Sequence, residues 1–384
     1  LLGKHFAILG TTGSGKSCTV ALVMHAILSR YSNGHVVLLD PHNEYSQAFG
    51  KAAEVIGPDT LELPYWLFNF EEISEILVSR TSRTREEERS ILVQLIQDAK
   101  KSYLGDVKEA DFVTADTPVP YRLGELTRFL DEAMGKLENA EKSAPYKNIR
   151  TRLEQLQADR RFDFLFSGLS VSDNMADILS RIFRIPVNGK PITIMDLSAV
   201  PSEILNVVVS VLCRMTFDFA IWSERSMPIL LVCEEAHRYA PRDTTAGFEP
   251  TKRAISKISK EGRKYGVSLC IVTQRPSELE TSILSECNTI FALRMTNVRD
   301  QDFVRAAMSE SSLGMMESLS SLRTGEAICV GEGVTLPVRM CFDTLPETHR
   351  PQSGTASFST AWENDNTDPN FIPEVISRWR IQRR

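Results

Sequence analysis

The sequence lacks the features that mark disulfide-rich, zinc-binding and membrane-spanning proteins. Its seven cysteines form no Cys-x-x-Cys pair, and no cluster of histidine and cysteine has zinc-ligand spacing. The longest apolar runs, such as residues 229–233, are far too short to cross a bilayer, and no signal peptide is visible. We therefore expect reduced cysteines, a cytoplasmic location and no contact with a membrane.

The chain also lacks an excess of basic residues. Its 44 Lys and Arg against 50 Asp and Glu give a formal net charge of −6. A protein that coats nucleic acid carries the opposite balance. Any contact with DNA would therefore be local, made by a few basic side chains that line a channel.

An initiating methionine is absent, and the chain opens only nine residues before a glycine-rich motif. We therefore expect further residues to precede it. The length of 384 residues exceeds that of an average domain, which favours a core with an insertion or a second small domain.

Strand and helix patterns alternate in most of the chain. An apolar run at residues 5–10, a helical pattern at 16–29 and a second apolar run at 35–39 form a βαβ unit, which implies a parallel sheet. Residues 326–330 and 334–342 flank a glycine-containing turn and predict an antiparallel hairpin at a sheet edge. Further strands are expected at residues 192–197, 229–233, 267–273 and 289–295, with helices between them.

The segment from residue 71 to residue 185 has a different character. It is rich in Glu, Arg, Lys, Leu and Ala, with apolar residues at helical spacing. We interpret it as a helical insertion in an α/β core. The predicted regions are the first part of the core (1–70), the insertion (71–185), the second part of the core (186–345), and a linker with a last helix (346–384).

A phosphate-binding motif follows the first expected strand. Residues 10–17 read GTTGSGKS and fit the pattern G-x-x-x-x-G-K-[ST] between a strand and a helix. Its glycines let backbone N–H groups surround phosphate oxygens, and the helix directs its positive end at the same anion. Lys16 should reach the β- and γ-phosphates, and Ser17 should bind Mg²⁺. We predict a site for ATP and Mg²⁺ whose nucleotide-binding residues are Gly10, Thr12, Gly13, Ser14, Gly15, Lys16, Ser17 and Cys18.

Polar side chains end two of the later expected strands. Glu234 and Glu235 follow the apolar run 229–233, at the edge of a parallel sheet where ligands bind. We expect Glu234 to hold Mg²⁺ directly or through water, and Glu235 to act as general base on the attacking water. Gln274 ends the next strand and is the candidate sensor of the γ-phosphate. A simple turn before Pro276 is the alternative interpretation of Gln274.

Residues 260–266 read KEGRKYG and end the helix before that strand. Basic residues at a helix C-terminus stabilise the helix dipole, which is one explanation. The other is an arginine finger that reaches the nucleotide of a neighbouring subunit. We favour Arg263 for this role, with Lys260 and Arg275 as alternatives.

Together these motifs resemble the HerA branch of the HerA/FtsK superfamily. The resemblance spans residues 6–342 and includes the sequences LLDPHNEY (38–45), LPYWLFN (63–69), EEAH (234–237), SKEGRKYG (259–266) and TQRP (273–276). It implies an α/β fold of the RecA-like, additional-strand P-loop ATPase type: a mostly parallel central sheet with helices on both faces. It also implies a hexamer with double-stranded DNA in its central channel and a partner effector, either a nuclease or a sirtuin-like NAD-consuming enzyme.

Two departures from that family pattern are visible. The family usually begins with a small β-barrel domain, which this sequence does not contain, and the acidic pair is Glu-Glu rather than Asp-Glu. The family motif also marks Asp40, His42, Glu44 and Tyr45. For these four residues a structural turn and a catalytic part remain equally open.

Two functions are compatible with these features. The first is an ATP-hydrolysing ring motor that translocates or unwinds double-stranded DNA, with residues 238–242 as a loop that could face the channel. The second is an ATP-regulated hexameric scaffold that activates an effector with little translocation. A two-lobe DEAH-type helicase is disfavoured because no second sheet-and-helix set follows Glu235. A small-molecule kinase is disfavoured because a Glu pair followed by a finger candidate suits a multimeric hydrolase.

Overall fold

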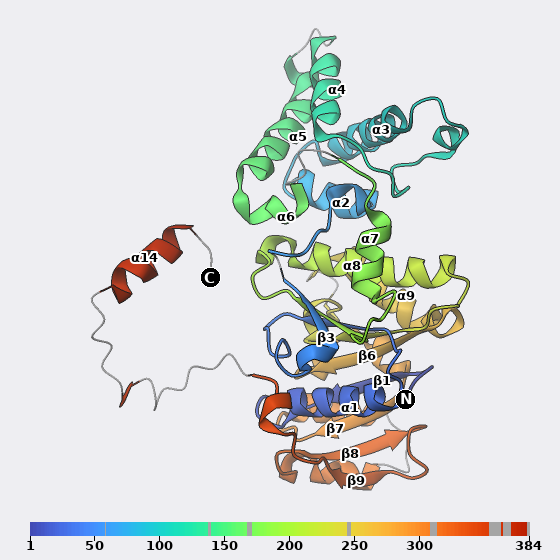
Figure 1. Ribbon diagram of the computed structural model, residues 1–384, viewed down its shortest axis with the longest axis vertical. Coiled ribbons are helices and arrows are strands. Elements are labelled where there is room, and N and C mark those ends of the chain that lie inside the picture. Colours follow the sequence, from blue (N-terminus) through green and yellow to red (C-terminus); the bar gives the residue numbers. More distant parts are fainter. Residues whose placement is uncertain are drawn as a thin grey trace.

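A nine-stranded sheet forms the centre of the protein (Figure 1). The computed structural model describes residues 1–57, 59–136, 140–166, 171–243, 247–307, 313–352, 362–363 and 370–381. The strand order is β3-β4-β2-β5-β6-β1-β7-β8-β9. Along this order, every pair of neighbouring strands from β3 through β7 is parallel. The last two strands, β8 and β9, are added antiparallel at one edge. The strands are β1 His5–Leu9, β2 Val36–Asp40, β3 Ala53–Ile56, β4 Ile192–Asp196, β5 Ile229–Cys233, β6 Val267–Thr273, β7 Cys287–Leu293, β8 Glu326–Gly331 and β9 Val338–Cys341.

Helices cover both faces of this sheet. Successive side chains of a strand point to opposite faces, so the residues of β1 divide between two hydrophobic clusters. Phe6 and Ile8 pack in the cluster that contains apolar residues of α1 (Lys16–Arg30). Ala7 and Leu9 belong to the cluster that contains residues of α8 (Ser202–Trp222), α9 (Glu249–Tyr265) and α10 (Thr281–Ser285). The expectation of a mostly parallel sheet with helices on both faces is confirmed.

A group of helices lies beyond α8 at one end of the molecule, opposite β8 and β9 (Figure 1). An ion pair joins it to the core: the half-buried Arg214 of α8 lies 2.9 Å from the buried Glu72 of α2, and Glu72 also forms a capping box with Asn69. Removing Arg214 would leave the buried carboxylate of Glu72 without its cation, which is destabilising. The helices of this group are α2 Phe70–Leu77, α3 Arg85–Leu104, α4 Leu123–Gly135, α5 Ala140–Ala158 and α6 Asp163–Phe166, and the following helix, α7 Met175–Phe183, lies beside α8 and contacts β2.

Helix α8 corrects the expectation that every apolar run is too short for a membrane. Among the described residues it is the one helix long and apolar enough to cross a bilayer by length and composition. Most of it is buried, because it contacts α9 and the strands β5 and β6. It is therefore a core helix, in which two faces rather than one are covered by protein.

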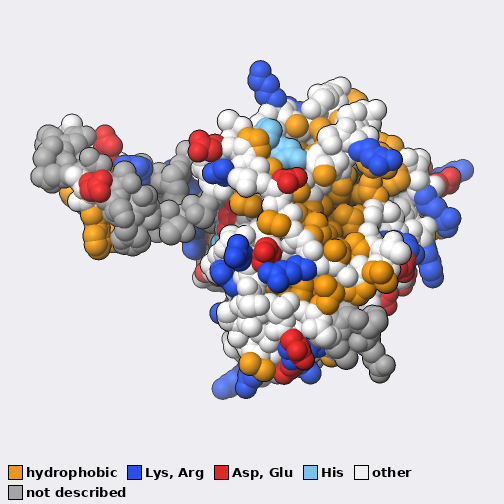
Figure 2. Space-filling view, turned by 90° about the horizontal axis from the view of Figure 1, so that it is seen from below, with side chains coloured by type: hydrophobic (Ala, Val, Ile, Leu, Met, Phe, Trp, Pro, Cys, Tyr) orange, Lys and Arg blue, Asp and Glu red, His pale blue; other side chains and the backbone are white. Residues whose placement is uncertain are grey.

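The expected hairpin is present as β8 and β9, which pair antiparallel at the sheet edge. Figure 2 looks at the molecule from the β9 side, where hydrophobic side chains gather across the middle of the surface. Leu336 and Val338, in this hairpin, are both exposed. The helices α11 Val298–Ala306, α12 Leu313–Met316 and α14 Phe371–Ile381 complete the described elements. The linker expected after residue 346 lies largely outside the described residues, apart from 346–352 and 362–363.

Candidate nucleotide-binding site

The phosphate loop connects the end of β1 to the start of α1. Gly15 caps the helix with φ +96, a left-handed conformation that favours glycine, and a Cβ at this position would lie 3.1 Å from the backbone N of Gly325. The Gly325 N–H in turn donates to the carbonyl of Ser14 at 3.0 Å. Because this close packing fixes the loop, the first N–H groups of α1 can point at a bound anion.

A cavity of about 440 Å³ opens beside this loop, a size that suits a nucleotide. It brings together side chains from the ends of β1, β2, β5 and β6. The Ser14 side chain is fully buried within the loop, and its Oγ has no hydrogen-bond partner. The predicted residues that line the cavity are Thr12, Gly13, Gly15, Lys16, Ser17, Cys18, Glu235 and Gln274.

Glu234 lies in a smaller cavity of about 20 Å³, which has room for one water molecule or one ion. Lys16, Ser17 and Glu44 also line it. Burial raises the pKa of the Glu234 carboxyl to about 7, although the hydrogen bond from the Tyr45 hydroxyl and the charge of Lys16 oppose this. Among the described residues, no three His, Cys, Asp or Glu side chains are arranged to hold a metal by themselves. Mg²⁺ prefers few carboxylates together with phosphate and water oxygens, so the residues present fit it as a partner of a bound nucleotide.

Glu235 has a strained backbone at the mouth of this site. Its φ of 52° and ψ of 40° are left-handed, which costs a non-glycine residue about 1–3 kcal/mol. The side chain is buried, and its Oε2 lies 3.2 Å from Nδ1 of His237 without a hydrogen bond. The same Nδ1 is hydrogen-bonded to Oγ1 of Thr273 at 2.9 Å, and burial lowers the pKa of His237. A buried carboxylate with an unbonded oxygen beside the nucleotide cavity suits a general base.

Gln274 follows β6 and touches the phosphate loop. The Thr12 hydroxyl donates to Oε1 of Gln274 at 2.5 Å. A short turn at Pro276–Glu278 follows immediately. The side chain therefore reaches the phosphate loop while the backbone enters that turn. A role as sensor of the γ-phosphate and a turn before Pro276 are thus compatible for Gln274.

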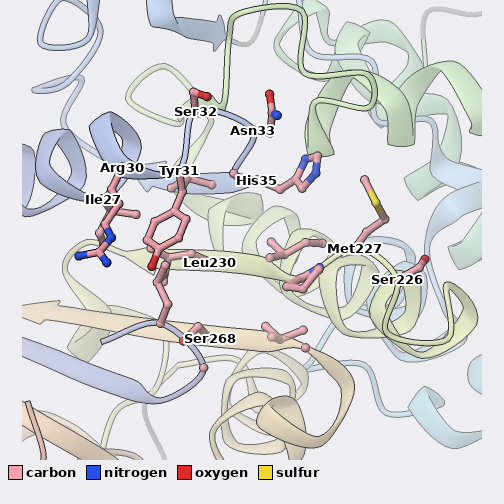
Figure 3. Close-up of a pocket in the computed structure, with 18 of the residues that line it drawn as sticks. Ile27, Arg30, Tyr31, Ser32, Asn33, His35, Ser226, Met227, Leu230 and Ser268 are labelled. Carbon is pink, nitrogen blue, oxygen red and sulfur yellow. The ribbon is translucent and has the colours of Figure 1, made fainter.

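Arg263 does not join these residues, because it lies at the opposite edge of the sheet. It lines a cavity of about 710 Å³ formed by the amino-terminal ends of β2, β5 and β6, and Tyr31, His35, Met227 and Leu230 line the same cavity (Figure 3). The seven residues of β6 separate the two edges by roughly 20 Å. Arg263 therefore cannot reach the phosphate loop of its own chain.

A glycine lets the arginine-bearing helix approach the sheet. A Cβ at Gly262 would lie 3.0 Å from the carbonyl oxygen of Val267 in β6. Helix α9 ends on Gly266, whose φ of 90° is again left-handed. The residues between these two glycines, among them the exposed Arg263, are thereby held at the start of β6.

The two alternatives to Arg263 lie in different places. Lys260 is exposed one turn earlier on α9. Arg275 lies at the nucleotide edge, where it pairs with Glu278 at 2.8 Å and lines a cavity next to Thr12. Arg275 is thus close to the phosphate loop of its own chain, and Arg263 is not.

The sequence interpretation missed Arg294. Its side chain donates to the carbonyl of Gly13 at 3.3 Å, and its own carbonyl accepts from the N–H and the hydroxyl of Thr11. Arg294 follows β7 directly, whereas the strand predicted at residues 289–295 places Arg294 inside it, so no signal for a site residue was visible in the sequence.

Replacing Lys16 with alanine should remove ATP binding and hydrolysis together. Lys16 is buried beside the acidic pair, where its charge is expected to bind the phosphates. Binding of a fluorescent ATP analogue and release of phosphate measure the two losses. Lys51→Ala, on the surface, is the charge-matched control. Hydrolysis that survives in Lys16→Ala would contradict the site assignment.

The fold and this site define a P-loop ATPase of the RecA-like type, an enzyme that hydrolyses ATP. The family model described as the central domain of helicase HerA matches residues 1–216, more than half of the chain. The chain belongs to this HerA family.

Curated relatives extend the likeness over most of the chain. It is 27% identical over 399 residues to the DNA double-strand break repair helicase HerA of Pyrococcus furiosus, covering 93% of this chain and 68% of that protein. It is 28% identical over 343 residues to the protein of the same name from Sulfolobus acidocaldarius, covering 89% and 65%. The chain thus spans about two thirds of the length of these relatives.

Two solved structures share the fold. VirB4 of Thermoanaerobacter pseudethanolicus superposes with a TM-score of 0.62 at 16% identity, covering 89% of this chain and 90% of that one. The plasmid coupling protein TrwB in complex with ADP and Mg²⁺ gives a TM-score of 0.55 at 14% identity, covering 92% and 87%.

Proposed function

We propose that this chain is one subunit of a ring-shaped, cytoplasmic motor, a hexamer that uses ATP to translocate or unwind double-stranded DNA. The observation that carries the proposal is the division of the site between two edges of the sheet. Lys16, Glu235 and Gln274 lie at one edge and Arg263 at the other. The interfaces of a closed ring are heterologous, so two different surfaces of the chain meet, and we propose that the first edge of one copy meets the second edge of the next.

Each side chain has a separate task in hydrolysis. Lys16 binds the terminal phosphates, and Glu235 takes a proton from the attacking water. Gln274 senses the γ-phosphate through its contact with Thr12. Arg263 of the neighbouring copy stabilises the charge that develops on the transferred phosphoryl group. A bound Mg²⁺, held from Ser17 and Glu234, would neutralise the phosphate oxygens.

The loop after the acidic pair is the candidate contact with DNA. Tyr239 and Ala240 are buried, and Arg242 N–H donates to the carbonyl of Glu278 at 2.7 Å, so the backbone is anchored. Arg238 and Arg242 are exposed on either side of this anchor. Two exposed guanidinium groups on an anchored backbone would contact phosphates without reading bases, which suits a motor that moves along any sequence.

Long double-stranded DNA should therefore raise the rate of ATP hydrolysis, and DNA binding should weaken as salt rises. Changing both Arg238 and Arg242 to alanine should lower the slope of log K against log salt by about 2, because each phosphate contact contributes about 0.9. Titrations by fluorescence anisotropy at several salt concentrations measure the slope. Arg128→Ala with Arg150→Ala, on exposed surfaces of α4 and α5, removes the same charge elsewhere. An equal change in that control would contradict the assignment of the loop.

A partner effector is part of the proposal. The names of the curated relatives describe DNA double-strand break repair helicases, and we propose a nuclease or a sirtuin-like NAD-consuming enzyme as the partner of this chain, in DNA processing or anti-phage defence. Single-molecule translocation by the complete complex is the test. Effector activity without movement along DNA would favour the ATP-regulated scaffold instead.

A further inference from the structure

The loop after β2 is held rigidly against the nucleotide site. The Asp40 carboxylate accepts hydrogen bonds from the backbone N–H of His42 at 3.2 Å and of Tyr45 at 2.9 Å. Tyr45 is completely buried and donates its hydroxyl to Glu234. On the other side, the N–H of Gln352 donates to the carbonyl of Glu44 at 2.8 Å. The backbone on both sides of Glu44 is therefore fixed.

The Glu44 side chain is directed at the phosphate loop. The Ser17 hydroxyl donates to Oε2 of Glu44 at 2.5 Å. Glu44 also lines both cavities of the site, the one that suits a nucleotide and the small one that contains Glu234. It is thus the acidic side chain that touches the hydroxyl expected to meet the cation.

A hydroxyl group has one proton to donate and two lone pairs to offer. When the proton of Ser17 goes to Glu44, a lone pair of the same oxygen is left free to face a cation. The carboxylate of Glu234 accepts one hydrogen bond at each oxygen, from the Tyr45 hydroxyl and, at 3.3 Å, from the N–H of Glu235, and each oxygen keeps a further lone pair. Glu235, whose buried Oε2 has no hydrogen bond, lines the same two cavities and marks the site as a place for a ligand.

We propose that Glu44 is the positioning residue that orients Ser17 for the divalent cation of a bound nucleotide. The proposal rests on the proposed ATP site. It adds a carboxylate at the end of β2 to the one predicted at the end of β5. Acceptors that orient a ligand in this way typically change metal affinity by about 10- to 100-fold.

The experiment measures binding, so it does not depend on catalysis. Binding of a fluorescent ADP analogue is titrated with Mg²⁺, and separately measured in EDTA, for the wild type, Glu44→Ala, Ser17→Ala and the double variant. Glu44→Ala should raise the half-saturating Mg²⁺ concentration about 10- to 100-fold and change the affinity in EDTA less than about twofold. In the Ser17→Ala background, Glu44→Ala should raise the half-saturating Mg²⁺ concentration by less than about a further twofold, because the two residues act together.

Two further variants complete the test. Gln47→Ala, which removes a neighbouring contact with Gln352, is the control and should leave the Mg²⁺ dependence unchanged. Glu44→Gln keeps the size and an acceptor oxygen, so it replaces Glu44→Ala where alanine unfolds the protein, with an expected rise of several fold in half-saturating Mg²⁺. An unchanged Mg²⁺ dependence, or an equal loss of affinity in EDTA, would overturn the proposal. Absence of DNA-stimulated hydrolysis in the wild type would contradict the motor and leave this measurement intact.

Discussion

Replacing Arg263 with alanine is expected to lower the rate of ATP hydrolysis by about 10³- to 10⁵-fold, the range reported for loss of an arginine finger. Affinity for ATP should change little, because Arg263 of the neighbouring copy stabilises charge that develops only as the phosphoryl group is transferred. Steady-state hydrolysis and equilibrium binding of a fluorescent ATP analogue measure the two quantities.

The neighbouring basic residues provide matched controls for this change. Lys264→Ala removes the same charge from the adjacent exposed position of α9 and should leave hydrolysis within a few fold of the wild type. Lys260→Ala and Arg275→Ala test the two alternatives. A large loss in Arg275→Ala with full activity in Arg263→Ala would transfer the role to a residue at the nucleotide edge of the same chain.

The change of Glu235 to glutamine should have the second large effect. Glutamine keeps the size of the side chain but cannot accept the proton of the attacking water, so hydrolysis should fall about 10²- to 10⁴-fold. ATP binding should persist, since the phosphate loop and Lys16 are untouched. Single-turnover hydrolysis and ATP binding, measured on the same preparation, separate the two steps.

The control for Glu235→Gln is Glu286→Gln, which changes an exposed carboxylate at the end of α10. This control should leave ATP hydrolysis and ATP binding unchanged. Thermal unfolding of both variants should resemble that of the wild type, because the isosteric change leaves the left-handed backbone at this position as it is. Loss of ATP binding in Glu235→Gln would indicate a structural role for this carboxylate and count against its role as base.

The strands that could be predicted from the sequence are those with continuous apolar runs. β5 and β6 were predicted at their observed bounds, since both are buried along their whole length. β3 was missed because it has four residues at the sheet edge, with two positions partly or fully exposed, and so carries no run or alternation. β7 was predicted two residues late because its first residues, Cys287 and Asn288, interrupt the apolar pattern.

The candidate site also contains one part made of consecutive residues and other parts made of residues far apart in the sequence. The phosphate loop was visible in the sequence because its chemistry is contained in eight consecutive residues. Contacts such as Thr12 with Gln274 and Tyr45 with Glu234 join residues about 190 to 260 positions apart in the chain. They depend on the strand order, which brings β1 beside β6 and β2 beside β5, and no local pattern gives that order.

Mixing two inactive variants tests most directly whether each nucleotide is hydrolysed between two copies of the chain. Lys16→Ala keeps Arg263, and Arg263→Ala keeps the phosphate loop, so a mixed ring contains interfaces at which an intact loop meets an intact arginine. Hydrolysis in the reassembled mixture should exceed that of either variant alone by at least about tenfold, given the rate effect of a finger. A mixture no more active than its parts, in rings shown by native mass spectrometry to contain both variants, would contradict the account.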